Sequence, residues 1–280
     1  MLSRLFGVAA VGLWALASMG CNFGGARVWT EAVTESHRVD ASGLSSLEVR
    51  THNGGIRYQG DGTTQEATIT VTKKAGGRTR KDAEQAFDAL DITIEPNEAG
   101  TCRVGWAWKT PRRSRWSADV NFMVVAPSKL NLMAESHNGA IGVTGAAGET
   151  RLVTHNGHIE VTASGPMLRA ETHNGGIQAG YEGRDLRLST HNGAIRADLS
   201  RCGPVGGELS THNGAIQLTV SSTTAADIEC STHNGRIQFD PPVSVGKVSR
   251  TNLEGKLGPG GPPLELETHN GSIRVKKSDG

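Results

Sequence analysis

The sequence predicts an all-β protein, a single-stranded β-solenoid of ~18–21-residue coils with an α+β insertion near its N-terminal end. Three observations lead to this fold class. A tetrapeptide recurs at nearly fixed spacing, and apolar residues alternate with polar ones on both sides of it. Gly is abundant, at 37 of 280 residues, whereas aromatic residues make up only 4%. This composition is typical of narrow coils with many corners.

The repeated tetrapeptide is Thr-His-Asn-Gly, with Ser136 in place of Thr in one copy. From His137, successive copies lie 18, 18, 18, 21 and 21 residues apart. A last interval of 36 residues contains a degenerate copy, VSRTNLEGKL, which we expect to form an irregular rung near the end of the stack. If the coils stack about 4.8 Å apart, the repeated side chains form ladders. The candidate ladder residues are His52, Asn53, His137, Asn138, His155, Asn156, His173, Asn174, His191, Asn192, His212, Asn213, His233, Asn234, His269 and Asn270.

Apolar residues flank each tetrapeptide at fixed positions. Ile stands four residues after the histidine of each tetrapeptide, and Val, Leu, Ala or Cys stands three residues before it. The alternation predicts a strand on each side of an Asn-Gly corner, in which Gly supplies a positive φ. A string of Asn-Gly β-hairpins has the same local pattern. Only stacked coils explain why His and Ile recur in every copy and Thr in all but one, so the solenoid is preferred.

Residues 1–20 have the features of a secretory signal peptide: a basic start at Arg4, an apolar stretch and then small residues. The Ser-Met-Gly-Cys sequence that ends at Cys21 resembles a bacterial lipobox, with Ser where Leu is usual. We therefore expect an exported lipoprotein of the bacterial cell envelope, in the periplasm or at the cell surface, with a membrane anchor on Cys21 and a tether over 21–43. An ordinary signal peptide cut near Ala17 and a retained anchor are the alternatives.

The rest of the chain, 44–280, is expected to be one β-solenoid domain, with an insertion over 60–129 and tandem coils over 130–276. We expect the insertion not to follow the solenoid pattern and to contain strands and a helix near 80–90, capped by Thr79. Its basic turn KTPRRSRW is interpreted either as a solvated hairpin tip over packed indoles or as a contact with anionic lipid or an acidic polymer.

The order of these segments resembles the bacterial putative-adhesin domain family of unknown function, whose members form toastrack-like β-solenoids in the cell envelope. The resemblance lies in LEVRTHNGGIRY, in the strand-helix-strand insertion after it, in VNFMVVAPSKLNLMAESHNGAIGV and in the tandem Asn-Gly-x-Ile coils. It covers about 44–275. It implies the fold and an envelope location, and it carries no catalytic residues that could be transferred. A histidine in nearly every corner departs from the family pattern.

The histidines favour a structural role, although they also suggest a second function. No acidic residue or cysteine recurs beside them, and a flat ladder does not by itself give the tetrahedral geometry that zinc prefers. Closely spaced imidazoles resist full protonation because like charges repel. We expect a non-catalytic, adhesin-like display or interaction module without a cofactor. The alternative is a periplasmic metal-binding or pH-responsive protein that uses the stacked histidines.

Other functional classes receive little support. The Asp residues of the coils occupy different phases of the repeat, so no carboxylate pair for glycoside hydrolysis stands out. A net charge of +1 gives no basis for binding nucleic acid. The expected partner is an envelope protein or a surface polymer. Cys102 and Cys230 alternate with core residues, whereas Cys202 is a candidate for exposure or for a bond to Cys230.

Overall fold

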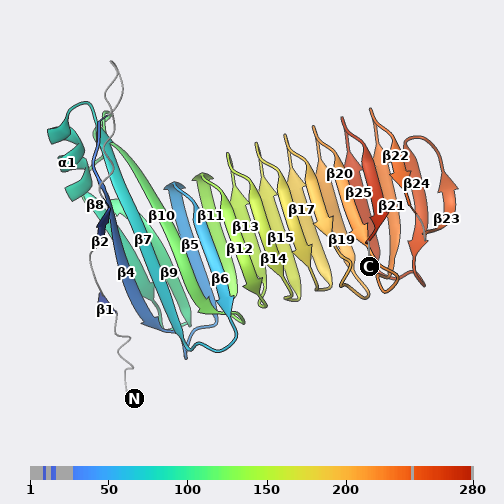
Figure 1. Ribbon diagram of the computed structural model, residues 1–280, viewed down its shortest axis with the longest axis horizontal. Helices are drawn as coiled ribbons and strands as arrows, with labels where there is room; N and C mark the ends of the chain where they lie inside the picture. Colours follow the sequence, from blue (N-terminus) through green and yellow to red (C-terminus); the bar gives the residue numbers. More distant parts are fainter. Residues whose placement is uncertain (1–8, 11–13, 17–27, 241–242, 279–280) are drawn as a thin grey trace.

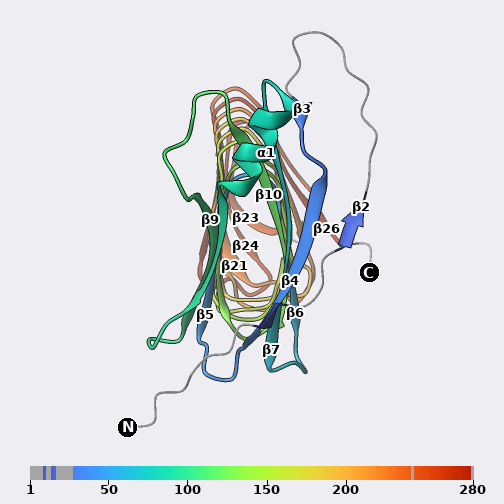
Figure 2. The ribbon, with the colours of Figure 1, turned by 90° about the vertical axis from the view of Figure 1, so that its left-hand side faces the viewer.

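The computed structural model describes residues 9–10, 14–16, 28–240 and 243–278. Over these residues it is all-β, with a 14-stranded and a 12-stranded sheet, both mostly parallel, and one short helix. The architecture is consistent with a β-solenoid. The strands stack along the long axis of an elongated body (Figure 1). The end view shows the two sheets facing each other across a narrow core (Figure 2).

We call two consecutive strands that are joined by a Thr-His-Asn-Gly corner a coil. The strands before the corners lie in the 12-stranded sheet, and those after them lie in the 14-stranded sheet. The first set is β5 (Ser46–Asn53), β11 (Asn131–Asn138), β13 (Thr150–Thr154), β15 (Met167–Thr172), β17 (Asp185–Thr190), β19 (Gly206–Thr211), β21 (Ala226–Thr232) and β25 (Pro263–Thr268). The second set is β6 (Ile56–Asp61), β12 (Ile141–Ala146), β14 (Ile159–Ala163), β16 (Ile177–Tyr181), β18 (Ile195–Asp198), β20 (Ile216–Val220), β22 (Ile237–Phe239) and β26 (Ile273–Lys277). The corners are not hairpin turns, because the strands that flank each one belong to different sheets.

Neighbouring coils pair in parallel, with equivalent residues opposite each other. Ile159 lies between Ile141 and Ile177. Leu152 lies between Ala134 and Ala170, which occupy the same position of the repeat. The Ile after each corner and the apolar residue three before each histidine are buried, except that Ile237 in the end coil is half-buried. The alternation predicted from the sequence is therefore confirmed, and it places one apolar core between the two sheets.

The corner glycines are needed for close approach rather than for a left-handed turn. Among them only Gly54 has a positive φ, 139°. A Cβ built on Gly175 would lie 1.9 Å from the carbonyl oxygen of Gly157 in the neighbouring coil, and seven of the corners have such a distance of 1.8–2.0 Å. The prediction that these glycines supply a positive φ is therefore wrong for all but Gly54. Gly recurs because successive backbones touch at the corner.

The insertion supplies one further rung to the stack. Its elements are β7 (Glu66–Gly77), α1 (Arg80–Asp88), β8 (Leu90–Pro96), β9 (Thr101–Trp108) and β10 (Ser117–Pro127). β9 pairs in parallel with β5, and β10 pairs in parallel with β6, with the loop 109–116 where a corner would stand. The expectation that the insertion departs from the solenoid pattern is wrong for these two strands, because they continue both sheets beyond the first coil.

Antiparallel strands and the helix close the N-terminal end of the stack. β8 pairs with β9, and β7 pairs with β10. The helix predicted near 80–90 is present as Arg80–Asp88, and Thr79 Oγ1 accepts a hydrogen bond from the Asp82 backbone nitrogen at 3.1 Å. It ends two residues early because Leu90 begins β8 and is buried. Figure 1 shows α1 on the outside of this end.

The N-terminal segment adds strands beside β7. These are β1 (Ala9–Ala10), β2 (Trp14–Leu16), β3 (Val28–Trp29) and β4 (Ala32–Asp40). β4 lies within the expected tether 21–43 and pairs antiparallel with β7, and β1 and β2 pair with β4. Most of the expected signal peptide 1–20 and Cys21 lie outside the described residues. In the part of the chain that is described, no helix is both long and apolar enough to span a membrane.

The C-terminal part breaks the tandem order once. The degenerate copy does not form an irregular rung. It contributes to an antiparallel hairpin of β23 (Val243–Val248) and β24 (Asn252–Leu257), and β24 pairs antiparallel with β21. The last coil of the sequence, β25–β26, lies between the coils β19–β20 and β21–β22. Chain order and spatial order therefore differ for the final two coils.

The contact between corner glycines gives a direct test. We expect Gly175→Ala to lower the free energy of unfolding by about 2 kcal/mol or more, because its Cβ meets a backbone carbonyl that cannot move independently. Chemical denaturation checks this. Gly203→Ala is the matched control, since nothing lies within 4 Å of a Cβ at that position. Equal denaturation midpoints for the two variants would contradict the close-approach explanation.

Candidate functional site: the histidine groove

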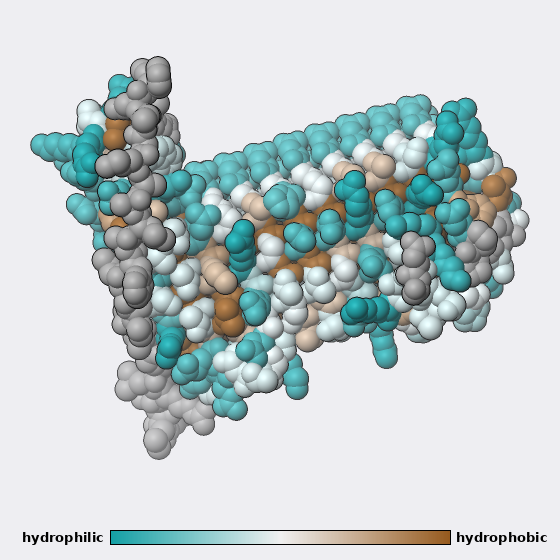
Figure 3. Space-filling model, in the orientation of Figure 1, coloured by the Kyte–Doolittle hydropathy of each residue, from teal (hydrophilic) through white to brown (hydrophobic). Residues whose placement is uncertain are grey.

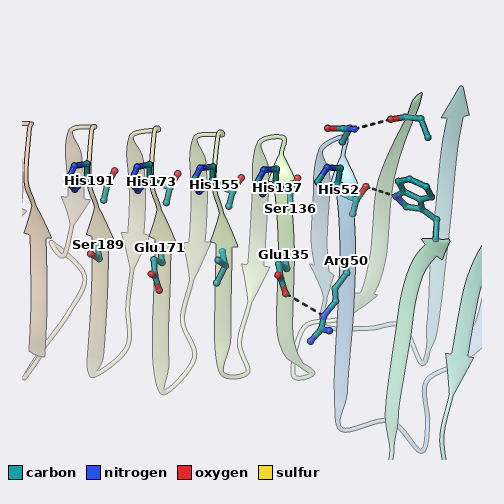
Figure 4. Close-up of a pocket in the computed structure, with 18 of the residues that line it drawn as sticks. Arg50, His52, Glu135, Ser136, His137, His155, Glu171, His173, Ser189 and His191 are labelled. Carbon is teal, nitrogen blue, oxygen red and sulfur yellow. Dashed lines mark hydrogen bonds and ion pairs between the residues drawn. The ribbon is translucent and has the colours of Figure 1, made fainter. Parts of the chain in front are cut away.

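The eight repeated histidines form one continuous stack. Ring centroids of neighbours are 4.7–4.9 Å apart, and their planes differ by 1–5°. The five labelled rings in Figure 4 have the same orientation. The spatial order is His52, His137, His155, His173, His191, His212, His269 and His233. All eight side chains are exposed, and Figure 3 shows a hydrophilic row along the edge of the body where the corners lie.

The asparagines form a second ladder next to the histidines. Asn174 Nδ2 donates to Asn156 Oδ1 at 2.8 Å, and Asn192 Nδ2 donates to Asn174 Oδ1 at 2.9 Å. The same bond joins Asn138 to Asn53, Asn156 to Asn138, Asn213 to Asn192, Asn270 to Asn213 and Asn234 to Asn270. Each bond contributes on the order of 1 kcal/mol, less where water competes, so the ladder aligns the corners more than it stabilises them.

The Thr or Ser before each histidine is buried and ties its coil to the neighbour. Thr190 Oγ1 donates a hydrogen bond to the carbonyl oxygen of Gly175 at 2.8 Å. The same bond joins Ser136 to Gly54, Thr154 to Gly139, Thr172 to Gly157, Thr211 to Gly193, Thr268 to Gly214 and Thr232 to Gly271. Thr51 donates to the Val120 carbonyl of β10 instead. A hydroxyl is required here because the corner carbonyl would otherwise be left without this partner.

A long groove follows the histidine stack along the outer face of the 12-stranded sheet. We call it the histidine groove; its volume is about 1170 Å³. Histidines of seven coils line it, together with the residues two positions earlier, which point outward because side chains alternate along a strand. Those residues are Arg50, Glu135, Val153, Glu171, Ser189, Ser210 and Glu267. The two rows are visible in Figure 4.

The insertion forms the N-terminal wall of the groove. Trp106, Trp108 and Arg112 line this end. Trp106 Nε1 donates to Thr51 Oγ1 at 3.1 Å, which fixes the indole against the first coil. The rings of Trp106 and Trp108 meet edge to face, with centroids 5.5 Å apart. The wall is therefore rigid and presents half-buried aromatic surface next to the first histidine.

The basic turn KTPRRSRW packs as a solvated tip over buried indole. Trp116 is buried, and the Arg113 guanidinium lies 5.0 Å from the centre of its ring. Arg112 Nε donates to the Trp116 carbonyl at 3.0 Å, and Arg115 pairs with Asp82 at 3.1 Å. Because its arginines already have partners, the turn favours the packing interpretation over a lipid-binding one.

Charges in the groove are few and mixed. Arg50 Nε lies 3.5 Å from Glu135 Oε2, which neutralises both side chains (Figure 4). Glu171 and Glu267 make no ion pair with any described residue, and Ser189 and Ser210 are linked by a hydrogen bond of 3.2 Å. The groove therefore offers imidazoles, hydroxyls and carboxylates rather than a strong charge of one sign.

The stack does not converge on a metal ion. Two nitrogen ligands that lie ~2.1 Å from one zinc ion are at most ~4.2 Å apart. The centroids of neighbouring rings are 4.7–4.9 Å apart and the rings have the same orientation. Equivalent nitrogens of neighbouring rings are therefore separated by about the same distance, which exceeds the ~4.2 Å limit. In the described part of the chain, no group of three or more His, Cys, Asp or Glu side chains could hold a metal ion.

His52 lies at the closed end of the stack, beside the insertion. Desolvation by the insertion lowers its pKa below the usual value of 6.5, and repulsion from His137 and Arg112 lowers it further. Protonation of this ring is therefore less favourable in the folded protein than in the unfolded chain. By linkage, its contribution to stability is present above pH 6.5 and is lost as the pH falls through the lowered value.

The cysteines of the described chain are buried free thiols. Burial raises the pKa of Cys102 to about 11 and those of Cys202 and Cys230 to about 12. The expectation that Cys202 is a candidate for exposure or for a bond to Cys230 is wrong. Its thiol donates to the Tyr181 carbonyl at 3.0 Å and fills the core beneath a loop. None of these three thiols reaches the groove.

No family model and no curated protein sequence matches this chain. It is similar to several solved structures of bacterial putative adhesins, as the sequence resemblance implied. A putative cell adhesion protein from Clostridium sporogenes is 10% identical with a TM-score of 0.38, and the match covers 89% of this chain and 100% of that one. A putative adhesin from Parabacteroides merdae is 10% identical with a TM-score of 0.45, covering 88% and 96%. A putative lipid binding protein from Parabacteroides distasonis is 13% identical with a TM-score of 0.30, covering 88% and 97%. At identities of 10–13% and TM-scores of 0.30–0.45, these structural similarities assign neither a ligand nor a residue role to this chain.

Sequence reasoning identified one side of the groove and missed the other. The histidines and asparagines stand out because they repeat. The residues two positions before each histidine vary in type, so repetition does not reveal them, although the two-residue period of a strand places them on the same face. The tryptophan wall could not be found this way, because Trp106 and Thr51 are 55 residues apart and meet only in the stack.

The lowered pKa of His52 predicts a pH dependence. We expect the melting temperature to fall more between pH 7.5 and 5.5 for the unaltered protein than for His52→Asn, because only the former must protonate an imidazole that resists protonation when folded. Thermal melts at both pH values check this. Carboxylates titrate in both proteins and cancel in the comparison. Parallel pH profiles would refute the assignment.

Proposed function

We propose that this protein is a non-catalytic interaction module that holds an extended polymer along its histidine groove. We further propose that it is an exported lipoprotein, adhesin-like in use, whose rigid β-solenoid is held at the bacterial envelope by a lipid on Cys21. The observation that carries the first proposal is the groove itself, which runs beside seven stacked histidines. Six spacings near 4.8 Å give it a length of roughly 29 Å.

The repetition of the groove favours a polymer over a compact ligand. Each coil presents an imidazole and a second outward side chain at the same height, so recognition groups recur at the coil spacing. A chain of similar units can contact several coils at once, and the combined affinity then exceeds that of any one contact. A small ligand would use only one or two of these equivalent positions.

The chemistry of the groove favours a hydroxyl-rich polymer, such as a linear glycan, over a peptide strand. The corner backbone is already paired between coils: the Asn174 N–H donates to the His155 carbonyl at 2.9 Å, and the corners of His155, His191, His212, His233 and His269 repeat this bond. A peptide therefore cannot add to the groove as a further β-strand. Imidazoles, carboxylates and serine hydroxyls can pair with sugar hydroxyls, and Trp106 and Trp108 offer apolar surface at the closed end.

The same repetition supports a non-catalytic role. A general base is set apart from other residues of its type by its surroundings and its pKa. Here the histidines stack with one geometry from coil to coil, and the lowered pKa of His52 comes first from its burial at the closed end. The groove carboxylates Glu135, Glu171 and Glu267 lie on coils that are not neighbours. A pH-responsive use of the stack is a second candidate, and the depressed pKa of His52 favours it.

Polymer binding can be tested with variants that leave the stack intact. We expect the purified protein to bind a linear polysaccharide from a panel in affinity electrophoresis, and the double variant Glu171→Ala, Ser189→Ala to weaken binding about tenfold, or about 1.4 kcal/mol. Glu160→Ala, an exposed site on the opposite sheet, is the control and should bind normally. Failure to bind any polymer, or equal weakening by the control, would reject the groove as a polymer site.

The anchor has its own test. We expect the protein to take up labelled palmitate during expression in bacteria and to fractionate with membranes. Cys21→Ser should abolish both, because lipidation requires the thiol. Cys202→Ala is the control, since its thiol is buried in the core. Membrane association that survives Cys21→Ser would point to a retained apolar segment instead.

A further inference from the structure

The last coil of the sequence is an inserted element of the stack. We call residues 263–277 the inserted coil. Its strand β25 pairs in parallel with β19 on one side and with β21 on the other, and β26 lies between β20 and β22. The coils on either side of it are consecutive in the chain. The inserted coil therefore occupies a slot between two neighbours that are joined directly to each other.

The inserted coil makes the same contacts to its two neighbours as the other coils make to theirs. Thr268 donates to the Gly214 carbonyl at 2.8 Å on one side, and Thr232 donates to the Gly271 carbonyl at 2.8 Å on the other. The His269 ring lies 4.8 Å from His212 and 4.7 Å from His233. The apolar residues of the inserted coil are buried to 0–1% exposure: Leu264, Leu266, Ile273 and Val275. The inserted coil therefore meets both neighbours through the repeat positions and through these buried apolar side chains.

The neighbours of the slot have the connection length of directly stacked coils. His191 and His212 are 21 residues apart and adjacent in the stack, and the same 21 residues separate His212 from His233. At the base of the slot the two coils still touch, since the Val205 N–H donates to the Ala225 carbonyl at 3.0 Å. Two residues later Asp227 is paired with Pro263 instead. The two coils are thus in contact at Val205 and Ala225 and are separated by the inserted coil from Asp227 onward.

A short glycine- and proline-rich hinge connects the inserted coil to the rest of the chain. β24 and β25 lie on opposite sides of β21, so residues 258–262 must cross the end of that strand. Gly258 and Gly260 adopt positive φ values of 55° and 82° to make the crossing. Five residues span at most about 17 Å when extended, which exceeds the two strand spacings of about 4.8 Å each that the crossing over β21 requires.

We propose that the slot is an intermolecular binding site, and that its occupant in an assembly is the inserted coil of a second copy of this chain. Two copies exchange these coils reciprocally and form a two-fold dimer. The ladder demands Thr, His, Asn, Gly and Ile at matched positions, and this chain itself supplies such a coil. Exchange re-forms the same hydrogen bonds, ring stacks and buried contacts in trans. Protein concentration and the hinge therefore set the balance between monomer and dimer.

Single cysteines distinguish exchange from surface collision. Ser210 lies opposite Glu267 across the edge of the slot, on the accessible groove face. Full-length Ser210→Cys and Glu267→Cys chains, each in a Cys21→Ser background, are mixed, refolded together and oxidised. Within one monomer neither cysteine has a cysteine partner. In an exchanged dimer the two are paired at a strand–strand distance that permits a disulfide. We expect a covalent heterodimer whose yield rises with protein concentration.

The matched control is Ser189→Cys mixed with Glu267→Cys. Ser189 pairs with Ser210, one coil farther from the inserted coil, and lines the same groove. We expect at least tenfold less cross-linked product from this pair. Equal yields would mean random collision, and a lack of heterodimer from the Ser210 pair after joint refolding at high concentration would overturn the proposal. The remaining cysteines of the described chain are buried and do not compete.

A hinge deletion provides an independent measurement. Removal of Gly258–Gly261 leaves Leu257 and Pro263 separated by one residue, a reach of about 7 Å. That is shorter than two strand spacings of about 4.8 Å each, which the crossing over β21 requires. We expect this variant to be dimeric by light scattering, and a variant with four residues added to the hinge to be monomeric. A monomeric deletion variant, or identical masses for both, would count against exchange.

Discussion

The contact between corner glycines of successive coils is the constraint on which the structure depends. Parallel strands stack about 4.8 Å apart, and at the corner this spacing leaves no room for a Cβ. The threonine hydroxyl then pairs with the glycine carbonyl of the neighbouring coil. With the corners held in this way, equivalent side chains on both sides of the glycine repeat at the same height in each coil. The histidine stack, the asparagine ladder and the isoleucine core are consequences of that register.

A stack of identical coils has two ends that must be closed, because unpaired strand edges recruit other strands. The two ends of this protein are closed by different means. At the N-terminal end the insertion first continues both sheets with β9 and β10 and then turns to antiparallel pairing with β7 and β8. At the other end the β23–β24 hairpin covers β21. The tryptophan wall of the groove is thus a by-product of closing the stack.

The two functional proposals rest on two features of the stack: the regular ladder of corners along the histidine groove, and the inserted coil, which breaks the chain order of the coils. A straight ladder of equivalent corners produces a groove with the same groups at each step, which suits a ligand that also repeats. The inserted coil interrupts chain order without disturbing the ladder, so the contacts between coils do not require that neighbours be consecutive in the chain. That independence of chain order is what allows a second copy to provide the coil.

The sequence by itself determined the repeat, the corners, the alternation of buried and exposed positions and the helix capped by Thr79, because each depends on residues close together in the chain. It did not reveal why glycine is required at the corners. A positive φ and a close approach to the carbonyl of the neighbouring coil both favour glycine, so the residue type alone does not distinguish them. Only the tertiary structure decided which coils are neighbours. Coils with the same motif can form the same ladder contacts in any order. Sequence similarity therefore does not show which of the coils that carry His212, His233 and His269 are neighbours in the stack. Their order depends instead on the hinge and the β23–β24 hairpin, and the groove wall depends on long-range pairing of β9 with β5.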